Sequence, residues 1–232
     1  MNIFNSTQPI FRRKQYDLDY QVRQGLLRIH WQIRNKTLFS SIYTKIDQIF
    51  VVWGLISVFI FLTAQFAPIS WVTQAIIWSI ITLIGTLVMI VLTHFWVQVE
   101  RLQWVLYTWA GLMLLGVVLT DCGIFLGWGQ ILLHLSHIWL LLVAIGYFCT
   151  AIGFQSRAFL LSGLIHLVGI VILPHVIGWQ FLFTGLVMGS NLLVFAETQW
   201  DMRLPIGNYG LLTEEQKYFN QQQQLLRQVI CY

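Results

Sequence analysis

The amino-acid sequence predicts an all-α integral membrane protein: a six-helix transmembrane bundle with an amphipathic cytoplasmic helix at each end. The first observation is composition, since charged residues make up 9% of the chain and hydrophobic residues 57%. A soluble domain has roughly a quarter of its residues charged, so this chain lacks the means to build a solvated surface. The other two observations are six successive apolar segments and thirteen Lys and Arg residues that all lie outside them.

The chain divides into three regions: a basic segment at 1–48, a six-span membrane domain at 49–198 and a cytoplasmic tail at 199–232. In the first region Val22, Leu26, Ile29 and Ile33 follow one another at spacings of four, three and four residues. This spacing predicts one apolar helix face among basic residues. Such a helix would lie in the membrane interface, attracted to anionic lipid headgroups, or would pack on the membrane domain or a partner subunit.

Six apolar segments make up the membrane domain, and a span needs about 20 residues. The segments are Ile49–Phe66, Ala75–Trp96, Trp104–Thr120, Ile131–Gly153, Ala158–Leu173 and Trp179–Ala196. The fifth is the shortest, and Pro174 follows it directly. Because proline ends or kinks a helix, we expect this span to be short or bent.

The distribution of positive charge predicts the orientation. With the N-terminus in the cytoplasm, all Lys and Arg residues fall in the N-terminal segment, the loops around Arg101 and Arg157, and the tail. The outer loops at 67–74, 121–130 and 174–178 contain no Lys or Arg. This matches the excess of Lys and Arg that is typical of cytoplasmic loops in membrane proteins. The sequence therefore predicts a multi-pass membrane protein with both termini cytoplasmic, in a bacterial plasma membrane (a cell inner membrane) or an organelle or thylakoid-type membrane.

The tail holds a signature of a helix start. Thr213 is followed by Glu214, Glu215 and Gln216, which resembles a capping box. We expect an amphipathic helix from this point, folded back on the N-terminal segment or docked on a partner.

The outer ends of the spans bring together residue types that bind metals. Asp121 and Cys122 follow the third segment, His134 and His137 lie near the outer end of the fourth, and His175 follows the fifth. These residues could hold a transition metal, or the imidazoles could ligate a haem iron. The cofactor candidates are His134, His137 and His175, to which Asp121 is added for a metal. The alternative is ordinary hydrogen bonding between helices, with Asp121 and His175 facing water.

The sixth segment carries a small-residue motif, Gly185-x-x-x-Gly189, followed shortly by Asn191. Small residues let two helices approach closely, and an amide can form a hydrogen bond across the contact. We expect this face to pack inside the bundle, or to form a contact in a homo-oligomer or with another membrane protein. His94 and His166 are interpreted as further hydrogen-bonding residues between helices.

No motif in the sequence favours one function over the others. No GxSxG, Walker A or HExxH sequence occurs, which disfavours an enzyme, and no basic-aromatic module indicates nucleic-acid binding. No convincing internal repeat supports an inverted-repeat transporter. The leading hypothesis is a non-enzymatic assembly, scaffold or regulatory subunit of a membrane complex. The alternatives are a small permease or channel lined by His94, His137, His166 or Asn191, and a redox protein that uses the outer histidines.

Overall fold

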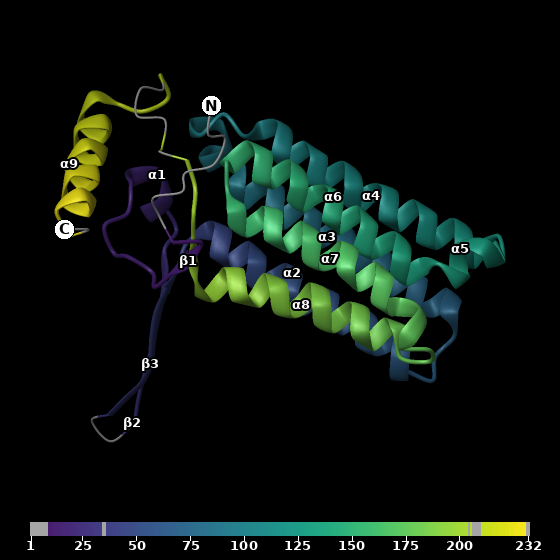
Figure 1. Cartoon of the computed structure of the whole chain (residues 1–232). Helices are drawn as coiled ribbons and strands as arrows, with labels where there is room; N and C mark the ends of the chain where they lie inside the picture. Colours follow the sequence, from purple (N-terminus) through teal and green to yellow (C-terminus); the bar gives the residue numbers. More distant parts are fainter. Residues whose placement is uncertain (1–8, 34–35, 204, 206–209, 231–232) are drawn as a thin grey trace.

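The computed structural model describes residues 9–33, 36–203, 205 and 210–230, and six of its helices are long and apolar enough to cross a membrane. This confirms the expected number of apolar spans. Figure 1 shows them side by side in one bundle. The spans are α2 (Lys45–Phe66), α3 (Trp71–Val99), α4 (Gln103–Phe125), α6 (Leu135–Phe154), α7 (Arg157–Ile172) and α8 (Gln180–Glu197).

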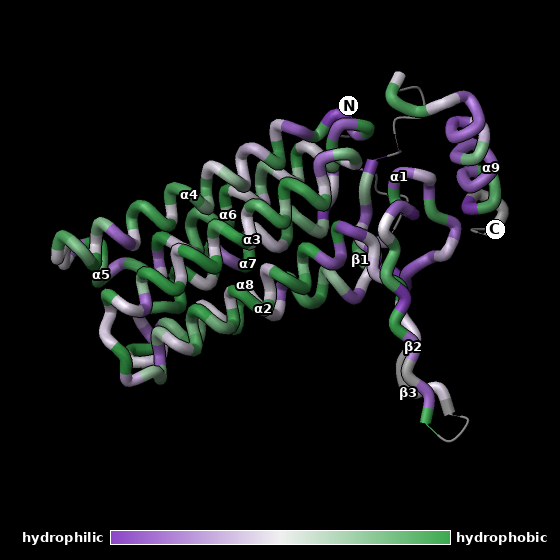
Figure 2. Tube along the Cα trace, turned by 180° about the vertical axis from the view of Figure 1, so that it is seen from behind, coloured by the Kyte–Doolittle hydropathy of each residue, from purple (hydrophilic) through white to green (hydrophobic). Residues whose placement is uncertain are grey.

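The spans form a closed ring. Neighbours pack in the order α2, α3, α4, α6, α7 and α8, and α8 returns to α2 in the most extensive helix contact of the fold. Figure 2 shows hydrophobic residues along the spans, while hydrophilic residues gather on α9 (Glu214–Ile230) and near α1 (Tyr20–Arg23). The first and last spans are therefore adjacent, and both ends of the chain leave the same end of the bundle (Figure 1).

Several span boundaries differ from the predicted ones. The third span, α4, continues through Asp121 and Cys122, which keep helical backbone geometry although they are polar. The predicted fourth segment is divided at His134 into the short α5 (Gly129–Leu133) and α6. After α7 the chain forms a short 3-10 turn, η1 (Leu173–His175), which contains Pro174.

The predicted N-terminal amphipathic helix is wrong. The helical part ends at Arg23, and Gly25 then adopts a left-handed backbone with φ of 74°. The chain continues as an antiparallel hairpin of β2 (Leu27–Ile33) and β3 (Lys36–Tyr43). Glycine accepts this conformation without strain, and the β-branched residues that follow favour strands. Figure 1 shows the hairpin projecting sideways from the end of the bundle, across the direction of the spans.

Glycines of α8 set its distance from α2. A Cβ at Gly185 would lie 2.7 Å from the Cβ of Phe61, and a Cβ at Gly189 would collide with Val58. On α2, a Cβ at Gly54 would lie 3.3 Å from Leu193. The two helices approach closely because none of these three positions has a side chain.

A remote carboxylate caps the start of α7. Asp201 is 1% exposed and accepts hydrogen bonds from the backbone N–H groups of Arg157 and Ala158, both at 3.0 Å. It also accepts from Ser156 Oγ and from Arg157 Nε, both at 2.9 Å. Burial would raise the pKa of Asp201, but the hydrogen bonds from Arg157, Ala158 and Ser156 outweigh it and hold the pKa below its ordinary value. The segment after α8 is thereby fixed to the α6–α7 loop.

The same segment also binds the N-terminal part of the chain. β4 (Gln199–Trp200) pairs antiparallel with β1 (Phe11–Arg12), and Asp201 N donates to Ile10 O at 3.1 Å. Just beside it, Lys14 Nζ lies 3.0 Å from Asp47 Oδ2, in the first turn of α2. These bonds place the described N-terminal residues across the ends of α2 and α8.

A chain of buried amides connects the tail helix to the bundle. Glu100, 2% exposed, accepts from Gln21 Nε2 at 3.1 Å, and Gln21 Oε1 accepts from Asn220 Nδ2 at 2.9 Å. Asp19 of the N-terminal segment also pairs with Arg227 of α9. The tail helix that the capping box predicted begins at Glu214, and Thr213 and Gln216 exchange the two expected hydrogen bonds, at 3.1 and 3.4 Å.

The approach of α8 to α2 can be tested with a pair of glycine substitutions. Gly189→Ala places a methyl group against Val58, and we expect it to lower the free energy of unfolding in mixed micelles by about 1–3 kcal/mol. Gly111→Ala on α4 is the matched control, because nothing lies within 4 Å of its new Cβ. Its better helix propensity should leave stability unchanged or raise it by up to about 1 kcal/mol. Equal effects of the two substitutions would contradict the close packing.

The Asp201 cap generates a pH prediction. A depressed carboxyl pKa contributes stability at pH values above the unfolded-state pKa, and this contribution is lost as the pH falls through the folded-state pKa. We therefore expect thermal stability to decline below about pH 4. Asp201→Asn should cost about 2–3 kcal/mol at neutral pH, because the buried donors of Ser156, Arg157 and Ala158 lose a charged acceptor. A variant with an unchanged neutral stability and an unchanged acid profile would show that the cap contributes nothing.

Candidate functional site

The structure separates the predicted outer metal ligands. The rings of His134 and His137 lie 5.5 Å apart, but Asp121 accepts hydrogen bonds from Ser79 Oγ on α3, at 2.9 and 3.0 Å. His175 is exposed in η1. Within the described residues, no group of three or more His, Cys, Asp or Glu side chains is arranged to hold a metal ion.

The other candidate polar residues make contacts between or within helices. His134 Nδ1 lies 2.9 Å from Gln130 O, and His94 Nε2 lies 2.9 Å from Gln98 Nε2. His166 is fully buried with Nδ1 2.8 Å from Ser162 O. The side chain of Ser162 donates to Asn191 Oδ1 of α8 at 2.7 Å. The glycine motif of α8 faces α2 of the same chain, as described above.

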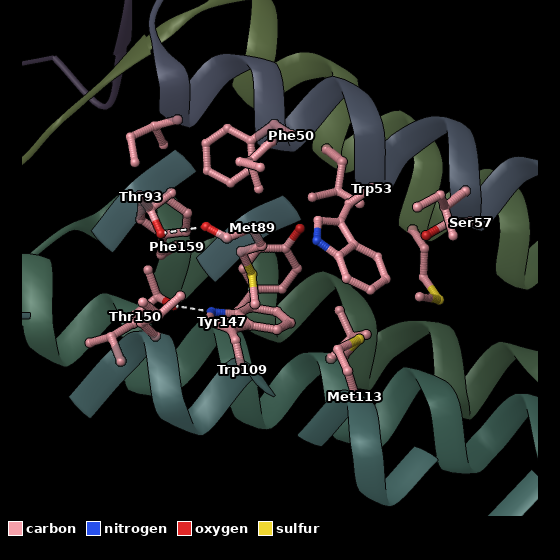
Figure 3. Close-up of a pocket in the computed structure, with 18 of the residues that line it drawn as sticks. Phe50, Trp53, Ser57, Met89, Thr93, Trp109, Met113, Tyr147, Thr150 and Phe159 are labelled. Atoms are coloured by element: carbon pink, nitrogen blue, oxygen red, sulfur yellow. Dashed lines mark hydrogen bonds between the residues drawn. The ribbon is translucent and has the colours of Figure 1, made fainter. Parts of the chain in front are cut away.

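The most prominent feature inside the ring is a cavity of about 130 Å³ to which all six spans contribute side chains. Its lining is mostly apolar and aromatic, with the hydroxyl residues Ser57, Thr82, Thr93 and Thr150, and it includes no Asp, Glu, Lys, Arg, His, Asn or Gln residue among those the structure describes. On α2 the lining residues extend from Ile46 to Phe61, which is roughly 22 Å at 1.5 Å per residue. Figure 3 shows the central part of this cavity, with Phe50 and Trp53 entering from α2.

Aromatic rings crowd the end of the cavity nearest the polar contacts of Asp201. Phe159 of α7 stacks on Phe195 of α8 with centroids 4.4 Å apart, and Trp200 lies edge-on to Phe159 at 4.8 Å. Phe154 stacks on Trp200 at 5.3 Å. Phe154 and Phe159 also line the cavity. The rings therefore form part of the cavity wall close to the segment that carries Asp201.

One wall of the cavity is built from two matching helices. The sequence Trp-x6-Gly-x3-Thr occurs in α4 as Trp109, Gly116 and Thr120, and in α6 as Trp139, Gly146 and Thr150. In this antiparallel pair, the ring of Trp109 covers Gly146 and the ring of Trp139 covers Gly116. Each glycine makes room for a large ring, so the two indoles lie in the helix contact and at the cavity wall.

Threonine hydroxyls accept hydrogen bonds from the indole N–H groups of this wall. Trp109 Nε1 donates to Thr150 Oγ1 at 2.8 Å, and Trp139 Nε1 donates to Thr120 Oγ1 at 3.2 Å. The same arrangement occurs between α3 and α2, where Trp78 Nε1 donates to Thr63 Oγ1 at 2.9 Å. Away from water a buried donor without an acceptor is costly, which explains the repeated pairing.

Two polar atoms at the cavity lack such a partner. Trp53 Nε1 on α2 and Tyr147 Oη on α6 are buried and form no hydrogen bond with any described residue. Both side chains line the cavity, as Figure 3 shows. The hydroxyl of Thr93, by contrast, donates to Met89 O at 2.7 Å within its own helix. Among the fully buried polar atoms of the described lining, those without a partner are thus an indole donor and a phenol.

The sequence prediction missed this cavity, although one signal for it was present. Residues that line an apolar space look like ordinary membrane-facing residues in composition. The Trp-x6-Gly-x3-Thr pattern occurs in both helices, and the structure shows each tryptophan packed on the glycine of the other helix. The contribution of α2, including Trp53, depends on the contact between the first and last spans, which no local pattern specifies.

The ring of six spans and its apolar cavity are the features from which a function must be argued, because comparison with family models, with curated proteins and with solved structures finds no significant match to this chain.

Proposed function

We propose that this chain is a non-enzymatic multi-pass membrane protein that binds an elongated apolar molecule inside its ring of spans. The observation that carries the proposal is the cavity lined by side chains of all six spans, with its apolar and aromatic surface. The length of the lining along α2 suits an alkyl chain or a similarly extended molecule.

The mostly apolar lining favours an apolar occupant. Apolar cavities of this order stay dry and take up apolar molecules, since a water molecule needs several polar partners. An empty cavity loses the dispersion contacts that packed neighbours would make, so an apolar occupant is favoured. The surrounding bilayer supplies such molecules at high concentration.

The same lining bears on the alternative functions. A permease for hydrophilic solutes needs a wet path, and His94, His137, His166 and Asn191 are absent from the described lining of this cavity. The hypothesis of a redox protein depends on outer histidines that lie apart from the cavity. Assembly or regulation of a larger membrane complex remains a proposal alongside ligand binding, and the hairpin and α9 are the segments that extend from the bundle toward such a partner (Figure 1).

We also propose that the basic N-terminal region contacts anionic lipid headgroups on the cytoplasmic side, with both chain ends in the cytoplasm. Residues 20–46 contain five Lys and Arg residues and no Asp or Glu. The hairpin extends across the direction of the spans, which is along the membrane surface if the spans cross it (Figure 1). Leu27 and Ile33 are 50% and 60% exposed, so apolar and basic groups are both available to the interface.

The headgroup contact predicts a dependence on lipid charge. In nanodiscs with anionic lipid, amides of residues 27–43 should exchange hydrogen about tenfold more slowly than in zwitterionic nanodiscs, because the hairpin is held at the surface. Arg28→Glu should remove most of this difference, and high salt should reduce it. Identical exchange in both lipids would contradict the contact.

Ligand binding is tested by filling the cavity. Val143 is 4% exposed and lines the cavity, while Leu141 on the same helix is 46% exposed. We expect an apolar molecule to co-purify with the wild-type protein at close to one per chain, measured by solvent extraction and mass spectrometry. Val143→Phe should reduce this amount at least about fivefold by occupying the space, whereas the control Leu141→Phe should leave it unchanged.

Two results would overturn the proposal. One is the absence of any stoichiometric apolar molecule, together with failure of the purified protein to take up alkane or ketone probes. The other is equal occupancy in both Phe variants while both remain monodisperse. Retained thermal stability of Val143→Phe would show that loss of the ligand reflects filled space and an intact fold.

A further inference from the structure

We infer that the apolar molecule carries a carbonyl group, and that its oxygen atoms accept hydrogen bonds from Trp53 Nε1 and Tyr147 Oη. This inference rests on the proposed function and adds the chemical class of the ligand to it. The ligand is thus a lipophilic carbonyl compound, with the carbonyl held between α2 and α6 and its apolar remainder along the cavity.

The orientation of Trp53 is set by its neighbours. A Cβ at Gly85 of α3 would lie 3.4 Å from Cζ2 of this indole, so the benzene part of the ring lies against the glycine. The indole nitrogen is buried and has no acceptor among the described residues. Because an indole N–H can only donate, it requires an acceptor that the surrounding protein does not supply.

Aromatic rings pack around Tyr147 on several sides and restrict its side chain. It is 1% exposed, and its ring is edge-on to Trp109 at 5.5 Å and stacked with Phe195 at 5.9 Å. The His166 ring lies 5.0 Å from it on a further side. These rings leave the phenol little freedom to turn, yet its hydroxyl has no hydrogen-bond partner among the described residues.

Other tryptophans of the bundle have hydrogen-bond acceptors, unlike Trp53. Trp78, Trp109 and Trp139 each donate to a threonine hydroxyl on a facing helix. The fold therefore supplies acceptors to these three indoles, two of which, Trp109 and Trp139, also line the cavity. Trp53 lines the same cavity without such an acceptor, which is expected where the acceptor arrives with a ligand.

A carbonyl oxygen fits these two groups best. It has two lone pairs, brings no hydrogen of its own, and can accept from an indole and a phenol together. A hydrocarbon would leave both donors unsatisfied, at the full desolvation cost of each. A water molecule would satisfy the donors, but it would lie among mostly apolar side chains, since the hydroxyls of Thr93 and Thr150 already donate within their own helices. Within a membrane, carbonyl groups on long apolar molecules occur in acyl esters and in alkylated quinones.

The test measures preference between matched probes. The protein is stripped of apolar molecules in detergent, and apparent Kd values are obtained from thermal-shift titrations with dioctyl ketone and with heptadecane. These probes have equal chain length and differ in the carbonyl. We expect the ketone to bind at least about fivefold more tightly, because each hydrogen bond formed contributes up to about tenfold. Decyl benzoquinone and methyl palmitate then distinguish a quinone ligand from an acyl ester.

Three variants assign the preference to the named groups. Trp53→Phe and Tyr147→Phe remove one donor each and keep an aromatic ring, so each should reduce the ketone-to-alkane ratio severalfold. Trp78→Phe is the control, because the nitrogen that it removes already has Thr63 as its acceptor and its ring is absent from the described lining of this cavity. It should change stability but leave the ratio unchanged, and the ratio itself is insensitive to a general loss of stability.

Each outcome decides between the proposals. Binding of neither probe overturns ligand binding itself. Equal binding of both probes, or a ketone preference that survives both Phe variants, overturns the carbonyl site while leaving apolar ligand binding intact. A ketone preference that falls in Trp53→Phe and Tyr147→Phe but persists in Trp78→Phe supports the site.

Discussion

The return of the last span to the first is the constraint on which the rest of this structure depends. Gly185 and Gly189 of α8 admit the side chains of Phe61 and Val58, so α8 packs closely on α2. Hydrophobic attraction between helices is weak in lipid, and close approach at small residues takes its place. Without this contact the six spans would form an open row, and the residues that line the cavity would face lipid.

Polar groups at membrane depth then follow a simple rule, since lipid offers them no partner. Three indoles take threonine acceptors, and threonine hydroxyls such as those of Thr93 and Thr150 donate to carbonyls one turn earlier in their own helices. Against this background the partnerless atoms Trp53 Nε1 and Tyr147 Oη are informative. His134 is less informative, because it is exposed and has a backbone partner, whereas His137 Nδ1 is buried without a partner among the described residues but does not line the cavity.

Much of the fold could be predicted from sequence because hydrocarbon imposes a length on every span. The six segments were found by that rule, whereas their ends were missed by several residues where polar side chains such as Asp121 stay helical. The N-terminal helix was wrong because Val22, Leu26, Ile29 and Ile33 satisfy a helical spacing, yet Ile29 and Ile33 also alternate with polar Arg28, His30 and Gln32. The left-handed backbone of Gly25 ends the helical part, and the residues that follow form a strand instead of a helix. The cavity could not be predicted, since its lining is brought together by contacts between distant spans.

The buried carboxylates among the described residues, Asp19, Asp47, Glu100 and Asp201, lie at one end of the bundle, and this bears on the ligand that we propose. At this end, Asp201 and Glu100 are buried with hydrogen-bond donors, and Phe154, Phe159, Phe195 and Trp200 stack beside the segment that carries Asp201. Buried charge thus lies at this end of the bundle, and the described lining of the cavity carries no charged side chain. A charged ligand would lose its hydration there without gaining a counter-charge. A neutral carbonyl loses little, gains the hydrogen bonds of Trp53 and Tyr147, and leaves its apolar remainder in contact with the rings that already form the wall.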